Sequence, residues 1–180
     1  VLAVMTAVVL VMNFPDSDQM SQFTSEVMVY GFLTTVALFF AVLLTEGELS
    51  PAHAVGMIAF LALPEDAIPV TLWAVFIASL IGGSALIARR SPAGHMPVKR
   101  PWRNLIFVAA RVTLSFFAAG QVYLFSGGAL PFADSALADA AGIFIVIVYI
   151  LVYLTLYTSI FVLEVYSDGR LVQNLVRNDL

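Results

Sequence analysis

Residues 136–163 read ALADAAGIFIVIVYILVYLTLYTSIFVL, an apolar stretch in which Asp139 is the single charged residue. A helix needs about 20 predominantly apolar residues to cross the hydrocarbon core of a bilayer. This stretch exceeds that length and therefore predicts a transmembrane helix. The composition of the whole chain agrees, because 61% of its residues are hydrophobic and only 11% are charged, with a mean hydropathy of +0.98. Soluble domains are about half apolar and about a quarter charged.

Further apolar stretches precede this one, and each predicts a membrane helix. They are Val1–Asn13, which we interpret as a helix missing its first turns, Val27–Thr45, Ala52–Leu63, Ala67–Ala88 and Asn104–Phe125. The stretch Ala52–Leu63 is short, so it either crosses with local thinning of the bilayer or forms a re-entrant half-helix. We expect an all-α, polytopic membrane bundle of about six segments over residues 1–166. Residues 167–180 would begin a cytoplasmic amphipathic helix or linker.

The basic residues orient this bundle, because cytoplasmic loops of membrane proteins accumulate Lys and Arg. The eight bases are Arg89, Arg90, Lys99, Arg100, Arg103, Arg111, Arg170 and Arg177. The pattern predicts an inner (plasma) membrane protein whose loop 89–103 and C-terminus are cytoplasmic. Residues 14–26 and the turn at Glu65 and Asp66 then lie outside. A re-entrant Ala52–Leu63 would reverse the first two segments, and their loops contain no Lys or Arg that would exclude this.

Arg111 is the main candidate for a functional residue. It lies about two turns, on the order of 10 Å, into the fifth predicted segment. An ionisable group at that depth costs free energy unless it is paired or reaches the interface. Two interpretations stay open. Its long stem extends back to the lipid phosphates, or its guanidinium group binds an anionic ligand or pairs with Glu164 on the next segment.

A row of tyrosines marks one face of the last segment. Tyr149, Tyr153 and Tyr157 are spaced four residues apart and therefore share a helix face. Such aromatic rows are usually core packing, and buried hydroxyls find hydrogen-bond partners. A ligand pocket is the alternative. Together with Arg111 and Glu164, these tyrosines are the predicted ligand or ion-pair residues.

Small residues recur at helical spacing and predict helix–helix contacts, because association in a bilayer depends on close packing. On the fourth segment they are Ala74, Ala78 and Gly82, with a second row at Ser79 and Gly83; on the fifth they are Ser115 and Ala119. We expect ordinary packing within the chain, with a face for a second copy or another membrane subunit as the alternative.

Several classes of chemistry are excluded by the residues that the chain lacks. Without Cys it has no disulfide, thiolate nucleophile or Cys-ligated metal. His53 is the only His in a predicted membrane segment, which rules out a bis-His haem within the chain; we interpret it as a polar residue near a helix end. No Walker loop, His-Glu-x-x-His or EF-hand pattern occurs. We expect no enzyme activity, no cofactor and no metal in these residues, and no nucleic-acid partner.

Four stretches follow one another in a recognisable order. They are Leu49–Leu63, Ala78–Ile87, Arg100-Pro-Trp-Arg-Asn104 leading into Leu105–Tyr123, and Tyr153–Asp179. This order resembles the polytopic membrane region that precedes HD-type cyclic-dinucleotide phosphodiesterases, diguanylate cyclases and some histidine kinases in bacteria. In such regions the last long helix emerges into a short cytoplasmic amphipathic segment, as at Asp168–Leu180. The resemblance implies a sensory or anchoring role with an output domain beyond Leu180, and it supplies no catalytic residue.

Two other functions remain open. Substrate-binding membrane subunits of vitamin-type transporters are likewise small, helical and rich in Gly and Ala. An accessory, non-catalytic subunit of a respiratory or photosynthetic complex would use a small-residue face to contact other subunits. In each case the expected partners are the lipid bilayer and a second copy of the chain or other membrane subunits.

Overall fold

The structure, a computed structural model, describes residues 1–39, 42–43, 48–49, 52–89, 101–132 and 140–167. Its helices are α1 (Leu2–Met12), α2 (Ser17–Phe39), α3 (Ala52–Ala62), α4 (Ile68–Arg89), α5 (Pro101–Phe125) and α7 (Ala140–Ser167). A 3-10 turn, η1 (Glu65–Ala67), joins α3 to α4. Between α2 and α3 the two-residue strands β1 (Val42–Leu43) and β2 (Glu48–Leu49) pair antiparallel. Apart from this strand pair, the prediction of an all-helical chain is confirmed for the described residues.

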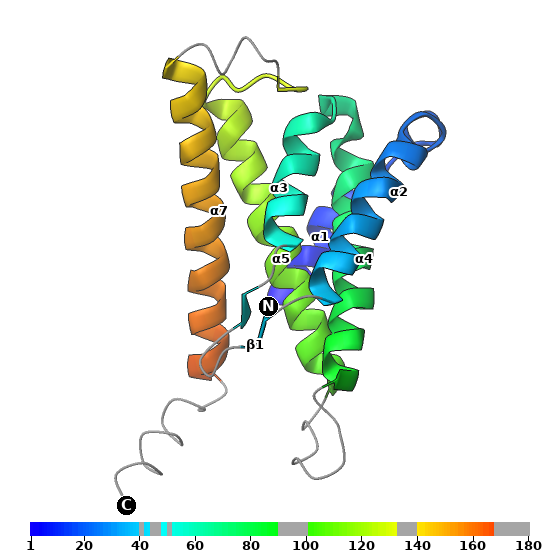
Figure 1. Cartoon of the computed structure of the whole chain (residues 1–180), viewed down its shortest axis with the longest axis vertical. Coiled ribbons are helices and arrows are strands. Elements are labelled where there is room, and N and C mark those ends of the chain that lie inside the picture. Colours follow the sequence, from blue (N-terminus) through cyan, green and yellow to red (C-terminus); the bar gives the residue numbers. More distant parts are fainter. Residues whose placement is uncertain (40–41, 44–47, 50–51, 90–100, 133–139, 168–180) are drawn as a thin grey trace, which may run out of the picture.

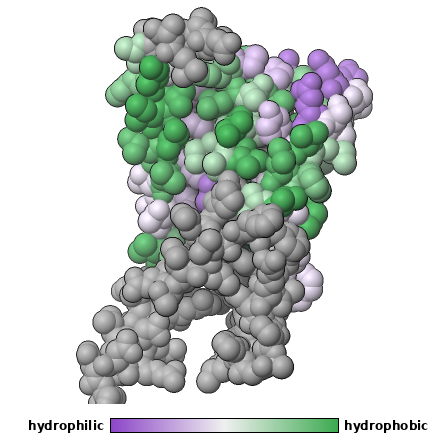
Figure 2. Space-filling model, in the orientation of Figure 1, coloured by the Kyte–Doolittle hydropathy of each residue, from purple (hydrophilic) through white to green (hydrophobic). Residues whose placement is uncertain are grey.

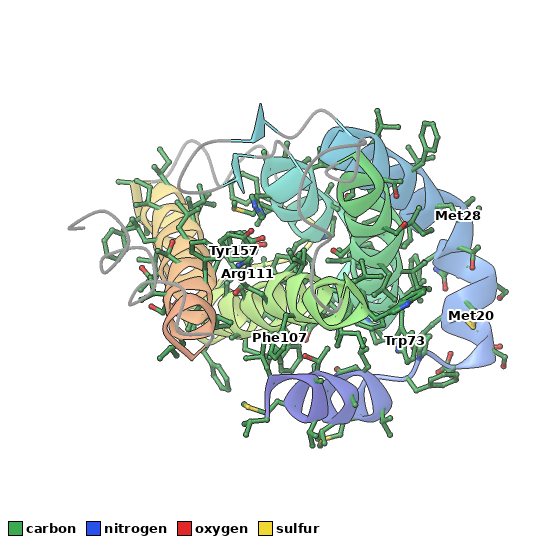
Figure 3. All side chains as sticks on the ribbon, turned by 90° about the horizontal axis from the view of Figure 1, so that it is seen from below. Met20, Met28, Trp73, Phe107, Arg111 and Tyr157 are labelled. Atoms are coloured by element: carbon green, nitrogen blue, oxygen red, sulfur yellow. The ribbon has the colours of Figure 1, made fainter. Side chains whose placement is uncertain are left out.

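The helices form a bundle in which four of them stand in a row. Neighbours in the row pack in the order α2, α4, α5, α7. Helix α3 lies on one face of this row and contacts α2, α4 and α5, whereas α1 lies on the opposite face against α5 and α4 (Figure 3). Along the chain the helices alternate in direction from α2 to α7 (Figure 1). The polar cluster described below lies where α3 meets α5 and α7.

Three described helical stretches are long and apolar enough to cross a membrane. They are Glu65–Ser84, Leu105–Phe125 and Ala140–Leu163, whereas Leu2–Met12 and His53–Ala62 are apolar but shorter. The three long stretches correspond to the predicted fourth, fifth and sixth segments. Apolar residues cover much of the described surface seen in Figure 2, and polar residues gather where α2 begins.

Helix α2 begins earlier than the segment predicted from the sequence. The predicted segment started at Val27, after an external loop over residues 14–26, but the helix starts at Ser17. The cause is a capping box: the Gln19 amide donates to Asp16 Oδ1 at 2.8 Å, and the Asp16 amide donates to Gln19 Oε1 at 3.2 Å. These reciprocal bonds satisfy backbone groups that a helix start leaves open. The first turns of α2 are therefore a polar helical extension rather than a loop.

Tight contacts fix the positions of α1 and α3. The Trp73 indole of α4 donates to the Leu10 carbonyl of α1 at 3.1 Å. On the other face, the Phe60 ring of α3 lies so close to Gly120 of α5 that a Cβ at Gly120 would lie 2.7 Å from it. Near the end of α3, the Phe132 amide donates to the Leu61 carbonyl at 2.7 Å. The contacts at Gly120 and Phe132 hold α3 beside α5. In this position the first turn of α3 reaches the polar cluster.

Candidate functional site

Arg111 lies inside the bundle, between α5 and α7. Its residue exposure is 4%, and it is ten residues beyond the start of α5, or about 15 Å along the helix axis. The Arg111 Nη2 atom donates a hydrogen bond to the Tyr157 hydroxyl at 2.9 Å. Its Cζ atom also lies 4.4 Å from the centroid of the Tyr157 ring and 4.9 Å from that of Phe161. The guanidinium group thus faces aromatic rings of α7 within the bundle, and the side chain does not extend to the bundle surface.

His53 joins the same region from α3. Its Nδ1 atom lies 2.7 Å from the Tyr153 hydroxyl, within hydrogen-bonding distance. Its ring centroid is 4.3 Å from that of Tyr157, in an edge-on arrangement. The Tyr153 and Tyr157 rings stack on each other at 6.1 Å with an interplanar angle of 12°. We refer to His53, Arg111, Tyr153 and Tyr157 as the Arg111 cluster. Figure 3 labels Arg111 and Tyr157, which lie between α5 and α7.

The local structure explains why these four residues meet. Tyr153 and Tyr157 are one turn apart on α7, and their shared face packs against α5. His53 is the second residue of α3, and this helix begins well inside the bundle, above the strand pair that precedes it (Figure 1). A polar ring at the start of α3 is thereby brought to the level of Arg111 on α5.

Tyr149, the third predicted tyrosine, belongs to a separate aromatic group. It lies one turn before Tyr153, and its ring stacks on Phe60 at 5.2 Å and meets Tyr123 edge-on at 5.8 Å. Tyr149 is fully buried, and its hydroxyl has no hydrogen-bond partner among the described residues. The Tyr123 hydroxyl instead donates to the Ala129 carbonyl at 3.0 Å. The tyrosine row therefore divides between core packing at Tyr149 and the polar cluster at Tyr153 and Tyr157.

The predicted packing residues lie mainly in the interior. Ala78, Ser79, Gly82 and Gly83 of α4 and Ser115 and Ala119 of α5 are buried, and Ala74 is partly buried. Two glycines show which helices come close: a Cβ at Gly31 of α2 would lie 3.8 Å from the Ala74 Cβ, and a Cβ at Gly83 would lie 2.8 Å from Cδ1 of Leu105 on α5. The small residues thus let α2 and α5 approach the two sides of α4, as in close helix packing within one chain.

Two predictions concern residues that the structure does not describe. The Glu164 side chain, proposed as an ion-pair partner of Arg111, lies outside the described residues, as does the predicted amphipathic helix over 168–180. His53, which was interpreted from the sequence as a polar residue near a helix end, lies in the same cluster as Arg111, a neighbourhood that the sequence did not predict. Its signal in the sequence was its position as the only His in a predicted membrane segment.

The chemistry of the cluster is that of hydrogen bonding and cation–π contact. Within the described residues, no group of three His, Asp or Glu side chains comes together to hold a metal ion. A guanidinium group, two phenols and an imidazole can exchange hydrogen-bond partners when a neighbouring helix moves. The arrangement therefore connects α3, α5 and α7 through polar side chains in a surrounding of apolar residues.

Comparison of the chain with protein-family models, with curated proteins and with solved structures gave no match.

Proposed function

We propose that this chain is a membrane-embedded sensory or anchoring module, in which α7 passes a conformational signal to a cytoplasmic domain that follows Leu180. The observation that carries the proposal is the buried Arg111–Tyr157 hydrogen bond, which ties α7 to α5. An ionisable residue inside a membrane bundle is costly, and it is usually functional when it is retained.

The small buried fraction of α7 supports a role in which this helix moves. Only 11% of its membrane-spanning stretch is buried, compared with 56% for α5. Its inward face carries Tyr149, Tyr153 and Tyr157, so the contacts that hold it are concentrated there. Small shifts of about 1–2 Å between packed helices are a common form of signal transmission. A change in the Arg111 cluster would therefore move the end of α7, which lies ten residues beyond Tyr157.

The proposed topology has six crossings, with loop 89–103 and the C-terminal end of α7 in the cytoplasm. In support of it, the end of α4, the start of α5 and the end of α7 lie at one end of the molecule (Figure 1). The start of α2 lies near η1 at the other end, where Phe23 and Val27 pack against Leu63 and Ala67. The exposed acids Asp18 and Asp66 belong to this second end.

The test uses the native-length protein in membranes. Arg111→Ala should change the activity of the domain that follows Leu180, because it removes the hydrogen bond that positions α7. Arg103→Ala is the control, since Arg103 lies in the first turn of α5 and is one of the basic residues whose charge would orient the protein. Equal output from the two variants would contradict the proposal.

The coding sequence after Leu180 provides a second arm of this test. A reading frame that continues into a signalling domain is expected. A neighbouring gene for an energy-coupling ATPase would instead favour a transporter subunit. Purification at fixed stoichiometry with cofactor-bearing subunits would favour the accessory role.

A further inference from the structure

A groove of about 240 Å³ lies between α1 and the pair formed by α4 and α5, and we refer to it as the α1 groove. Helix α1 lines it from Ala3 to Val11, and α5 contributes Ile106 and Ala110. Val11 is 71% exposed and Ile106 is 44% exposed, so the groove opens onto the outer surface of the bundle. Helix α1 lies at the middle of the height of the bundle (Figure 1), a level that the hydrocarbon of a bilayer would surround.

The wall of the α1 groove offers little to a polar ligand. The Thr6 hydroxyl donates to the Leu2 carbonyl at 3.0 Å, and the Trp73 indole donates to the Leu10 carbonyl at 3.1 Å. These are the two polar side chains of the wall, and no ionisable side chain from the described part of the protein lines it. A charged or polar group placed there would lose its hydration without compensation. The groove therefore selects an uncharged, apolar occupant.

The shape of the groove narrows the choice among apolar occupants. From Ala3 to Val11 helix α1 rises about 12 Å. A volume of about 240 Å³ over this length gives a mean cross-section on the order of 20 Å². An α-helix with its side chains is about 10 Å in diameter and is too wide to enter. A single hydrocarbon chain is long and narrow in the same way, and it restores the dispersion contacts that an empty groove lacks.

We propose that the α1 groove binds one acyl chain of a membrane phospholipid, with the headgroup outside the groove. The chain would lie against α1 on one side and the Trp73 and Phe76 rings of α4 on the other. Thr6 and Leu10 are the only buried residues of α1, so the lipid would add to the few contacts that hold this helix. The inference rests on the membrane location in the proposed function, but it does not require a sensory or anchoring role.

The first test is native mass spectrometry of the full chain released from detergent after incubation with dioleoyl phosphatidylcholine. Wild type should retain one lipid per chain. Ala7→Phe should lose it, because Ala7 lines the groove and the added ring would fill it. Val8→Phe is the matched control, since Val8 is the next residue of α1 but is exposed and is not part of the wall. Equal retention by the two variants, or a dimer without bound lipid, would overturn the proposal.

Fluorescence quenching in vesicles keeps the proposal testable if Ala7→Phe fails to fold, because the smaller Ala7→Leu can replace it there. The chain contains two tryptophans, so Trp102→Phe leaves Trp73 as the only reporter and Trp73→Phe leaves the exposed Trp102. Phosphatidylcholine brominated on its acyl chains should quench both reporters relative to the unbrominated lipid.

The groove-filling variants then separate the acyl-chain site from the membrane location. Ala7→Phe or Ala7→Leu should reduce the quenching of Trp73 and leave that of Trp102 unchanged. Quenching of Trp73 that neither variant reduces, with Trp102 still quenched, would contradict the acyl-chain site alone. Loss of quenching at both tryptophans in the otherwise wild-type chain would contradict the membrane location itself.

Discussion

Arg111 illustrates how one ionisable residue sets demands on the residues around it. Its guanidinium group donates to the Tyr157 hydroxyl and lies over the Tyr157 and Phe161 rings. Planar stacking and directed N–H groups are properties that a lysine ammonium group lacks, so Arg and Lys are not equivalent at this position. The chemistry of the cluster thus depends on the shape of the side chain as well as on its charge.

The energetic link between Arg111 and Tyr157 can be measured by a double-mutant cycle. Tyr157→Phe should lower the free energy of unfolding by about 1.5–3 kcal/mol, the usual contribution of a hydrogen bond to a charged group. The same change in an Arg111→Met background should cost clearly less, because its hydrogen-bond donor is already absent. Both values come from equilibrium unfolding in detergent or bicelles.

Tyr30→Phe is the control for this cycle. The Tyr30 hydroxyl makes no hydrogen bond within the described part of the chain, so this variant should stay near wild type. Strictly additive effects of Tyr157→Phe and Arg111→Met would show that the two side chains do not interact energetically.

At the scale of elements, apolar helices were predicted from the sequence more accurately than polar helical segments. The last long helix was predicted within a few residues, because an uninterrupted apolar run has few alternative structures. The start of α2 was missed, because Asp16 and Gln19 form a capping box within a polar stretch that was interpreted as a loop. His53 was placed on the correct helix but not with Tyr153, since a contact between residues a hundred positions apart depends on tertiary packing.

The contact between α3 and α5 predicts that Gly120 cannot be replaced by alanine without a loss of stability. In Gly120→Ala the new Cβ would lie 2.7 and 2.9 Å from Phe60 ring atoms. Phe60 is itself held by Tyr149 at 5.2 Å and Phe116 at 5.5 Å, so it cannot move aside without disturbing both. Overpacking of this kind should cost about 1–3 kcal/mol of unfolding free energy.

Gly31→Ala is the matched substitution in α2. Its Cβ would meet only the Ala74 Cβ at 3.8 Å, an ordinary contact. Replacing a helical glycine by alanine should then stabilise the protein by roughly 0.5–1 kcal/mol. Thermal unfolding in detergent compares the two variants. A Gly120→Ala protein as stable as Gly31→Ala would show that α3 does not press on α5 as described.

For the whole molecule, the proposed topology predicts which residues are accessible from each side of the membrane. The chain contains no Cys, so each introduced Cys is a single reporter. In intact cells a membrane-impermeant maleimide should label Asp18→Cys, Asp66→Cys and Ala129→Cys. His95→Cys should be labelled only after the membrane is permeabilised.

The labelling of Asp18→Cys decides between the two arrangements that the charge pattern allowed. If α3 crosses together with its flanking residues, Asp18 and Asp66 are on the same side, as their common end of the bundle favours (Figure 1). If the α3 segment were re-entrant, the first two segments would be reversed and Asp18→Cys would be protected while Asp66→Cys reacts.

The hydrogen bond between His53 and Tyr153 also affects how the protein is made. The two residues are 100 positions apart in the chain. At a synthesis rate of roughly 5–20 residues per second, Tyr153 leaves the ribosome on the order of 5–20 s after His53. During this interval α3 must be inserted and held without its partner on α7. The polar cluster between α3, α5 and α7 is therefore complete only once α7 has been made, so synthesis separates the insertion of α3 from the formation of its contact with α7.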